Sequence, residues 1–363
     1  MNKRKRTALV TGACGFVGSH LVDLLVQTGY YIKATDLENV STRRIDKYIN
    51  SKQIEYQPSD VRKKETLKPL VENVEIIFHP AALFNLCISY SKLYDVNVSG
   101  TENLCKEATS AGVKKLINWS SSSVYGCWEG QPTAKTEKDP LRVEDMANDY
   151  AVSKYEQEKM AQSYDKTMRV TSVRPGNIYG IGTYMGLAMP MKNLKLGLLQ
   201  RPPAKKGLEA YSSHVHVEDV VRATEFLANK KEAEGQIYNL VENDAVQVKE
   251  LFELGCKMLN KKMKKGYENP ATLKMSAYAF SAIAGVRNFF AVTLLRDDYK
   301  WYPLFDAESV DLMVKHHILS NKKIRDLGFE FKHSIKKSIE EVIRYHESTK
   351  WKEIPWFSKY KVK

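Results

Sequence analysis

The chain has 363 residues, of which 43% are hydrophobic and 27% are charged, which predicts a soluble globular protein with room for more than one domain. Its formal net charge is +13, but no repeat, low-complexity tract or nucleic-acid recognition motif accompanies that charge. We therefore expect no nucleic-acid partner, and either a solvated lysine-rich surface or an attraction to anionic lipid or a phosphorylated substrate. Five scattered cysteines without metal-ligand spacing predict reduced thiols in a cytoplasmic protein.

The first expected element is a short apolar strand over residues 7–11, followed by a glycine-rich turn and then a helix. This order of elements is the context that a dinucleotide-binding fingerprint requires. Gly12 allows the tight turn, Gly15 lets the backbone approach a pyrophosphate at the helix N-terminus, and Gly18 lets helix and strand pack closely. The N-terminal end of the chain is therefore predicted to bind a dinucleotide.

A second expected strand, over residues 31–36, ends in a carboxylate at Asp36. A carboxylate at this point can accept hydrogen bonds from both ribose hydroxyls and would repel a 2′-phosphate, which favours NAD over NADP. Arg43 and Arg44 follow closely and keep NADP open as an alternative, because an arginine can hold a 2′-phosphate.

Further strands are expected over residues 54–56, 75–79, 115–119 and 169–174, and they alternate with helical segments. This alternation predicts an α/β fold with a doubly wound parallel sheet of the Rossmann type. Ligands of such sheets bind beyond the carboxyl ends of the strands. The residues at the predicted strand ends, which we expect to converge on one crevice, are Gly12, Asp36, Asp60, Ala81 and the serine run 120–123.

Tyr150 lies four residues before Lys154 in a predicted helix, so the two side chains share one face of it. A nearby ammonium favours the phenolate and is expected to lower the pKa of Tyr150 from its ordinary value of about 10. An oxidised nicotinamide would add a second positive charge. The pair is therefore predicted to act as a general base that removes a hydroxyl proton while hydride leaves the same carbon.

Eight motifs, in this order over about the first 220 residues, resemble the extended short-chain dehydrogenase/reductase superfamily, which includes nucleotide-sugar epimerases and dehydratases and 3β-hydroxysteroid dehydrogenases. They are Thr11-Gly12-x-x-Gly15-Phe16-x-Gly18, Asp60-Val61, His79-x-Ala81-Ala82, Asn97-Val98-x-Gly100-Thr101, Ser120-Ser121-x-x-Val124-Tyr125-Gly126, Tyr150-x-x-x-Lys154, Arg174-Pro175-Gly176-Asn177-Ile178-Tyr179-Gly180 and His216-Val217-Glu218-Asp219-Val220.

The resemblance implies the catalytic set Ser121, Tyr150 and Lys154, in which Ser121 holds and orients the substrate oxygen. Ser122 and Ser123 are alternatives for that role or line the same pocket. His79 takes a structural position. The resemblance and the glycine turn together give the cofactor-binding set Gly12, Gly15, Phe16, Val17, Gly18, Asp36, Asp60, Val61, Ala81, Ala82, Asn97, Tyr150, Lys154 and Pro175.

The resemblance also divides the chain into two parts and implies a homodimer formed through two helices per subunit. Residues 1–180 would form the NAD-binding Rossmann domain, to which residues 213–240 return. Residues 181–212 and 241–363 would form a substrate-binding lobe. No metal site is expected, because the pairs His214 with His216 and His316 with His317 lack a third ligand in the sequence.

Three features of the C-terminal half favour a hydrophobic substrate. Residues 275–295 are strongly apolar, but Arg287 lies in the middle, so we expect a monotopic or pocket-covering element, or an ordinary buried helix pair, rather than a membrane span. A lysine cluster before this segment suits anionic headgroups and peripheral membrane contact. Residues 303–312 and 320–328 resemble the tail of the steroid and sterol branch. The cluster comprises Lys261, Lys262, Lys264 and Lys265.

The residues before His216, at positions 210–213, lack the arginine that binds the diphosphate in nucleotide-sugar enzymes. Arg201, Arg222 and Arg296 remain candidates to replace it. We therefore predict an NAD-dependent oxidoreductase that oxidises a secondary alcohol, or reduces the ketone, of a sterol-like or lipid substrate. The alternative is a nucleotide-sugar epimerase or dehydratase that recycles NAD in its site, and a third class is a non-catalytic NAD-binding protein.

Overall fold

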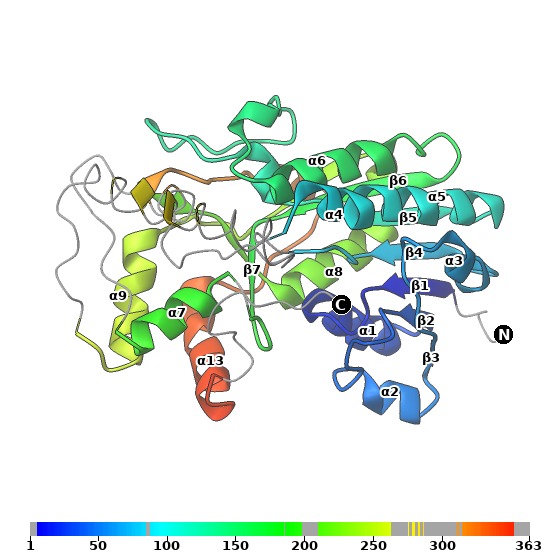
Figure 1. Cartoon of the computed structure of the whole chain (residues 1–363), viewed down its shortest axis with the longest axis horizontal. Helices are drawn as coiled ribbons and strands as arrows, with labels where there is room; N and C mark the ends of the chain where they lie inside the picture. Colours follow the sequence, from blue (N-terminus) through cyan, green and yellow to red (C-terminus); the bar gives the residue numbers. More distant parts are fainter. Residues whose placement is uncertain are drawn as a thin grey trace.

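The computed structural model shows a parallel sheet with helices on both faces and a smaller helical part beside it (Figure 1). The residues that the structure describes are 6–84, 88–184, 186–197, 210–262 and 314–351, together with Met275, Tyr278, Ala279, Ala282, Ile283, Val286 and Asp311.

The central sheet has seven parallel strands in the order β10-β6-β5-β4-β1-β2-β3. The strand order reverses between β1 and β4, which is the switch point at which doubly wound sheets bind ligands. The predicted doubly wound fold is therefore confirmed. The strands are β1 (Thr7–Thr11), β2 (Tyr31–Thr35), β3 (Ile54–Tyr56), β4 (Ile76–His79), β5 (Lys115–Trp119), β6 (Arg169–Pro175) and β10 (Ile237–Leu240).

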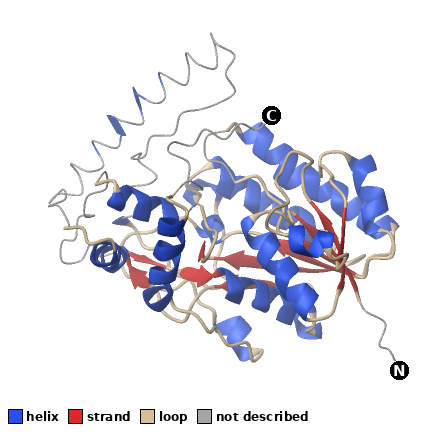
Figure 2. Cartoon of the chain, turned by 90° about the horizontal axis from the view of Figure 1, so that it is seen from below, coloured by secondary structure: helices blue, strands red, loops and turns tan. Residues whose placement is uncertain are grey.

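The inner strands are apolar runs because both faces of the sheet are covered. All four residues of β4 are buried, as are the last four residues of β1 and of β5. Figure 2 shows the strands as one layer with helices on either side. One face packs against α1 (Phe16–Gln27) and α8 (Val217–Ala228), and the other packs against α3 (Lys64–Val71), α5 (Gly100–Ser110) and α6 (Asp149–Gln162).

The segment before α5 is not one regular α-helix. Helix α4 (Tyr90–Tyr94) continues into a π-helical turn, Asp95–Ser99, before α5 begins. Such turns often mark functional sites because they shift side chains out of the regular helical register. A Cβ at Gly100 would lie 2.6 Å from a methyl carbon of Val61, so only glycine lets the helix approach the end of β3 this closely.

A second apolar core forms beside the sheet, and its helices come from segments predicted to make the substrate lobe. They are α7 (Ala188–Lys195), α9 (Val248–Met258) and α13 (Ile335–Ser348). Two small sheets connect the parts: β7 (Asn177–Tyr179) with β9 (His214–His216), and β8 (Tyr211–Ser212) with β11 (Val246–Gln247).

The chain returns to the core of the large sheet a second time after the segment 213–240. Ile324 of α12 (Lys322–Asp326) and the nearby Phe329 are buried in the same core as α1 and α8. These residues lie within the range 241–363 that the sequence assigned to the substrate lobe. The two-part division therefore stays a prediction, and in space its C-terminal range contributes to both cores.

Gly18→Ala is expected to lower the free energy of unfolding by about 3 kcal/mol, because the added Cβ would collide with the carbonyl oxygen of Gly12. Chemical denaturation followed by circular dichroism measures this loss. Gly29→Ala is the control, since a Cβ at Gly29 meets no atom within 4 Å and adds only the strain of a φ of +84°, about 1 kcal/mol. Equal losses in the two variants would contradict the steric argument.

Candidate active site

A cavity of about 910 Å³ lies at the carboxyl ends of the central strands. This volume is at the upper end of the range of about 300–1,000 Å³ that is common for ligand sites. The structure brings all of the predicted site residues except Asn97 to its wall. These residues are Gly12, Gly15, Phe16, Val17, Gly18, Asp36, Asp60, Val61, Ala81, Ala82, Ser121, Tyr150, Lys154 and Pro175.

The glycine turn between β1 and α1 forms the floor of one end of the cavity. Gly12 has a φ of +60°, and a Cβ there would lie 2.9 Å from the Cα of Ala81 at the end of β4. Helix α1 begins at Phe16, and the preceding N-cap residue, Gly15, supplies no side-chain hydrogen bond to cap it. The first-turn N–H groups of α1 and the positive end of its dipole therefore suit a pyrophosphate.

Asp36 stands where β2 ends, and two backbone N–H groups fix its carboxylate. Its Oδ2 accepts from the N–H of Cys14 at 3.0 Å and its Oδ1 from the N–H of Leu37 at 2.8 Å. Burial raises the pKa of Asp36, while these hydrogen bonds favour the charged form. The guanidinium of Arg44 donates to the carbonyl oxygen of Gly182 at 2.8 Å, and neither Arg43 nor Arg44 lines the cavity.

Asp60 at the adenine end of the predicted site is paired with Arg62, which sequence reasoning missed. Arg62 Nε donates to both carboxylate oxygens of Asp60 at 3.0 Å, and its Nη2 donates to Oδ2 at 2.6 Å. Burial alone would raise the pKa of Asp60, but the hydrogen bonds and charge of Arg62 outweigh it and lower that pKa. In the sequence, this ion pair could have been inferred from the arginine that follows Asp60 by two residues, after a predicted strand.

Behind the cavity wall, His79 joins β4 to β1 and α5 through two buried hydrogen bonds. Its Nδ1 lies 2.7 Å from Thr11 Oγ1, and its Nε2 lies 2.9 Å from Thr101 Oγ1. Thr101 donates to the carbonyl oxygen of Asn97, so His79 Nε2–H donates to Thr101 and Thr11 donates to Nδ1. Burial lowers the pKa of His79 to about 3, which keeps the ring neutral. This geometry fits the structural role that the resemblance implied.

Asn97 lies behind the wall rather than on it. Its Oδ1 accepts from the N–H of Leu83 at 2.7 Å, and its Nδ2 donates to the carbonyl oxygen of Leu83 and to Ser153 Oγ. Asn97 therefore ties the loop after β4 to helix α6. Its described contacts position other residues of the site instead of facing a ligand.

Helix α6 carries Tyr150 and Lys154 into the cavity, and a buried ion pair fixes the helix against the sheet. The side chain of Asn148 caps α6 by accepting from the N–H of Ala151 at 2.8 Å. Farther along, Arg174 of β6 donates to both carboxylate oxygens of Glu158, and both side chains are only 4% exposed. The ion pair therefore holds α6 against the strand that follows it, beside the site.

Among the three candidate serines, Ser121 is the one that contacts Tyr150. The hydroxyl of Ser121 forms a hydrogen bond with Tyr150, and this bond favours the phenolate. Ser123 donates to Ser121 Oγ from both its N–H, at 3.1 Å, and its hydroxyl, at 2.8 Å. Ser122 is buried in the turn that follows β5. This arrangement favours Ser121 as the residue that orients a substrate oxygen.

The pKa of Tyr150 shifts in the opposite direction to the one expected from the sequence. Burial raises the pKa of Tyr150, and the hydrogen bond from Ser121 offsets only part of that effect. Burial also lowers the pKa of Lys154, to about 7, and its ammonium donates to Gln157 Oε1. Burial therefore dominates the pKa of both groups, in contrast to the lowered pKa of Tyr150 that the sequence predicted.

Apolar side chains surround the reacting end of the cavity. The ring of Phe84 packs edge-on against that of Tyr150, with centroids 4.7 Å apart. Leu83, Ile178 and Tyr184 line the same cavity. Sequence reasoning missed Phe84 and Tyr184, and only the position of Phe84 just after the His-x-Ala-Ala motif offered a signal.

The histidine pairs considered as metal ligands make other contacts. His333 adds a third group to His216 and Glu218, but the rings of His216 and His333 are stacked, with centroids 4.0 Å apart and planes 18° apart. His216 Nδ1 accepts from the N–H of Glu218 at 3.3 Å. In-plane lone pairs of stacked rings do not converge on one ion, so the arrangement fits a histidine stack better than a tetrahedral metal site.

A family model described as the NAD dependent epimerase/dehydratase family matches residues 8–240. The chain belongs to this family. The match covers every motif of the cavity wall, and it makes the protein an enzyme that uses NAD. The resemblance to extended short-chain dehydrogenases/reductases is thereby confirmed.

Curated relatives of the two substrate classes are equally similar to this family member. The 3 beta-hydroxysteroid dehydrogenase/Delta 5-->4-isomerase of Mycobacterium tuberculosis is 29% identical over 257 residues, 68% of this chain and 66% of that protein. The dTDP-D-glucose 4,6-dehydratase of Mus musculus is 29% identical over 268 residues, 69% of this chain and 73% of that protein. Sequence similarity therefore does not choose between steroid and sugar substrates.

A solved structure with the same fold is the UDP-glucose 4-epimerase of Thermus thermophilus in complex with NAD. It superposes with a TM-score of 0.69 at 20% identity, covering 94% of this chain and 99% of that chain. The likeness concerns the fold, in which the family's NAD site and the cavity of this chain are built on the same sheet.

The residues of this cavity fit NAD. The Gly12 turn leaves room that a Cβ would fill, the N-terminus of α1 faces a pyrophosphate position, and the Asp36 carboxylate stands where a ribose would end. NAD in this cavity would supply the hydride acceptor or donor, and a positive charge when oxidised. A positive charge beside the Tyr150 phenol would offset the raised pKa of Tyr150.

Asp36→Asn is expected to weaken NAD binding about tenfold, because a charged acceptor of the ribose hydroxyls is lost. NADP binding is expected to strengthen, because the repulsion of a 2′-phosphate also disappears. Isothermal titration with both nucleotides measures the ratio of dissociation constants. Glu38→Gln removes a nearby charge that is exposed and outside the cavity wall, and it should leave the ratio unchanged. An unchanged ratio in Asp36→Asn would contradict the assignment.

Proposed function

We propose that this enzyme oxidises a secondary alcohol of a hydrophobic, sterol-like or lipid substrate with NAD, or reduces the corresponding ketone. Ser121 hydrogen-bonds the substrate oxygen and orients it, and Tyr150 removes the hydroxyl proton as hydride leaves the same carbon. Lys154 lies one helical turn after Tyr150 and holds the cofactor side of the site. The ketone reduction uses the same groups in reverse.

One observation supports this chemistry most directly: Ser121 and Tyr150 are hydrogen-bonded to each other on the wall of the cavity that carries the NAD fingerprint. Lys154 lines the same cavity and is buried. Three groups from β5 and α6 therefore surround one position at which a substrate carbon would meet a nicotinamide. A protein that only bound NAD would not need this set.

Two observations favour a hydrophobic substrate. Phe84 and Tyr184 lie near Tyr150, and Ile178 adds a further apolar side chain to the same cavity wall. In the described part of the wall, Arg62 is the only arginine, and Asp60 already holds it. A diphosphate is best bound by a free arginine fork, which this part of the cavity does not offer.

The candidates to replace the missing arginine lie elsewhere. Arg222 pairs with Asp219 and lies over the ring of Phe329, and it is not part of the cavity wall. Arg201 and Arg296 lie outside the described residues.

A nucleotide-sugar epimerase or dehydratase is the second candidate, favoured by Lys92. This side chain lines the cavity, and a lysine ammonium can bind a phosphate as a point charge. The similarity to a dTDP-D-glucose 4,6-dehydratase also supports it. The two candidates differ in the fate of the hydride: a dehydrogenase releases NADH, whereas an epimerase or dehydratase returns the hydride within one cycle.

Absorbance at the reduced-nicotinamide band, with added NAD and a panel of sterols, long-chain hydroxy-lipids and nucleotide sugars, separates the two candidates. Native mass spectrometry of the purified protein shows whether NAD stays bound. NADH that accumulates with a lipid alcohol supports the dehydrogenase. Turnover of a nucleotide sugar with retained NAD and no net NADH would replace it with the second candidate.

Tyr150→Phe is expected to lower kcat by a factor of about 10² to 10⁴, because the general base is lost while the ring stays in place. Steady-state kinetics on the active substrate, with NAD binding measured separately, test this expectation. Tyr155→Phe is the matched control, since it removes a hydroxyl from the same helix outside the cavity wall. Full activity in Tyr150→Phe with NAD still bound would refute the mechanism.

We further propose that the protein is cytoplasmic and touches a lipid surface through exposed apolar residues of the segment 275–295. In the described parts of the chain, no helix is long and apolar enough to cross a membrane. The rest of that segment, Lys264, Lys265 and residues 303–310 lie outside the described residues. The exposed apolar residues, at helical spacing, are Met275, Tyr278, Ile283 and Val286.

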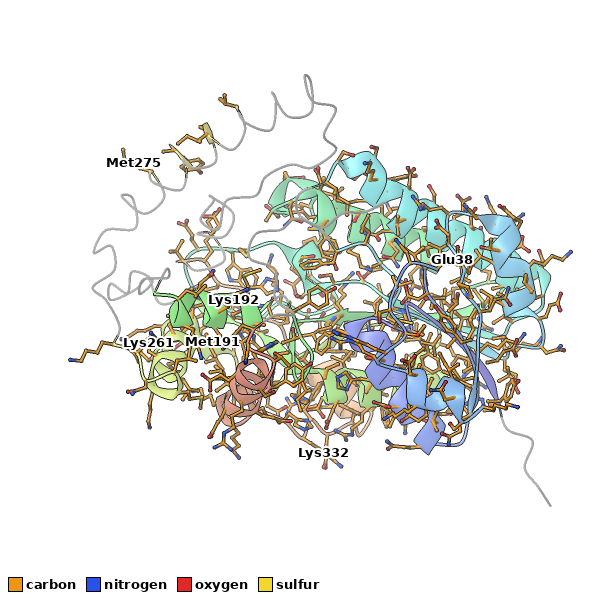
Figure 3. The ribbon with its side chains drawn as sticks, turned by 60° about the horizontal axis from the view of Figure 1, so that its bottom comes forward. Glu38, Met191, Lys192, Lys261, Met275 and Lys332 are labelled. Carbon is orange, nitrogen blue, oxygen red and sulfur yellow. The ribbon has the colours of Figure 1, made fainter. Side chains whose placement is uncertain are left out.

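The surface beside these residues carries a charge that suits anionic lipid. Lys261 and Lys262 are exposed at the end of α9. Figure 3 shows Met275 and Lys261 on the same side of the molecule, far from Glu38 near the NAD-binding half. Each basic residue near an anionic membrane contributes about 1 kcal/mol to binding, and the net charge of +13 adds long-range attraction.

The double variant Ile283→Glu and Val286→Glu is expected to reduce binding to vesicles of phosphatidylserine and phosphatidylcholine at least tenfold, because both apolar contacts are lost. Co-sedimentation measures the bound fraction. Val143→Glu is the control, since Val143 is also exposed, by 49%, but lies before α6. Equal loss in the control, or no binding by the wild type, would contradict membrane contact through this segment.

The homodimer implied by the resemblance stays part of the proposal. Helices α5 and α6 lie together on one face of the sheet, where they are in position to meet the same helices of a second copy (Figure 1).

A further inference from the structure

His317 comes from a different part of the sequence than the other residues of the cavity wall. Every other described residue of the wall lies between Thr11 and Gly186, in the part of the chain that carries the NAD motifs and the reacting groups. His317 follows more than a hundred residues later, in the C-terminal range 241–363 of the predicted substrate lobe. It is the one residue of the range 241–363 in the described wall.

The backbone around His317 is held firmly. Its N–H donates to the carbonyl oxygen of Tyr211 at 2.8 Å, and its own carbonyl oxygen accepts from the N–H of Ser213 at 2.8 Å. The preceding residue, His316, exchanges two backbone hydrogen bonds with Trp128, at 3.0 and 2.7 Å. These bonds join the segment to the loop after Ser121 on one side and to β8 on the other.

The orientation of the His317 ring follows from one hydrogen bond. Its Nδ1 lies 2.9 Å from the carbonyl oxygen of Gly126. A carbonyl oxygen can only accept, so Nδ1 carries the proton. Burial lowers the pKa of His317, and the charge of Lys135 acts in the same direction, although the bond to Gly126 opposes them. The ring is therefore neutral, and Nε2 is an acceptor.

The carbonyl group that orients His317 is itself fixed. Gly126 has a φ of +65°, and a Cβ there would collide with the carbonyl oxygen of Asp145. Gly126 ends the same turn that begins at Ser121. The ring of His317 is thus positioned by the loop that also positions the catalytic serine.

The other ring nitrogen, Nε2, is available to a ligand. Among the described residues, Nε2 of His317 has no hydrogen-bond partner, although the residue is only 5% exposed and lines the cavity. A ligand that covers this acceptor without donating to it would leave it unpaired, at a cost in free energy. The reacting hydroxyl is not that donor, because its proton is directed to Tyr150.

We propose that His317 is a specificity-determining residue whose Nε2 accepts a hydrogen bond from a second donor group of the substrate, away from the reacting carbon. The substrate is then a hydrophobic alcohol that carries a further hydroxyl or N–H group, rather than one with a single polar end. This inference rests on the alcohol oxidation proposed above.

The test uses a panel of 3-hydroxysteroids, each paired with an analogue that carries one further hydroxyl at a different ring position. NADH formation by the full-length enzyme gives kcat and KM for each compound. A site built to bind a hydroxyl rejects the analogue that lacks it by large factors. We expect at least one dihydroxy compound to exceed its partner at least tenfold in kcat/KM, mainly through a lower KM.

Two variants separate the nitrogens of the ring. The amide of His317→Asn reaches the position of Nδ1, so it can still donate to Gly126 but offers nothing at Nε2. The longer amide of His317→Gln reaches the position of Nε2 and can accept there. Asparagine is expected to abolish the tenfold preference, and glutamine to retain at least a third of the preference.

These experiments distinguish failure of the role of His317 from failure of the proposed function. If the wild type forms NADH with the steroids but no added hydroxyl raises kcat/KM, the role of His317 is overturned and the dehydrogenase stands. A preference that survives in His317→Asn overturns it as well. If the wild type forms no NADH with any alcohol, both proposals fall. Thermal melting and NAD affinity equal to those of the wild type confirm that the variants are folded.

Discussion

The site depends on how closely three backbone segments approach one another at the start of the chain. The turn after β1 lies against the end of β4, where Gly12 faces the Cα of Ala81, and α1 leaves the turn so tightly that a Cβ at Gly18 would collide with the carbonyl oxygen of Gly12. This approach directs the first N–H groups of α1 into the cavity. It also brings Asp36 within reach of the Cys14 N–H, so the ribose end and the phosphate end share one rigid frame.

Behind that frame, buried polar groups determine where the reacting residues stand. Thr11, His79 and Thr101 form one chain of hydrogen bonds across β1, β4 and α5. Arg174 and Glu158 form a buried ion pair that joins β6 to α6. Such a pair contributes little net stability but is costly to break, by about 3–5 kcal/mol when one partner is removed. In this fold, the ion pair fixes the position of α6, the helix that carries Tyr150 and Lys154.

The two halves of the cavity are lined by different kinds of chemical group. The NAD half is lined by backbone and carboxylates supplied by the first strands, and the family match covers all of it. The reacting half combines Ser121 and Tyr150 with apolar side chains such as Phe84, and receives His317 from the distant C-terminal range. The groups that select the substrate are therefore to be sought in the second half.

The sequence by itself predicted six of the seven strands of the central sheet, the glycine turn, Asp36 and the Tyr150–Lys154 pair, but not β10. It could do so because an apolar run bounded by glycine, and a spacing of four on a helix, are local features with one physical outcome. For the serine that would orient a substrate oxygen, it favoured Ser121 and left Ser122 and Ser123 as alternatives. Only the tertiary structure showed that Ser121 contacts Tyr150, that Arg62 holds Asp60 and that His317 joins the wall. The direction of the Tyr150 pKa also came from the structure, because desolvation depends on everything packed around a group and not on its neighbours in the chain.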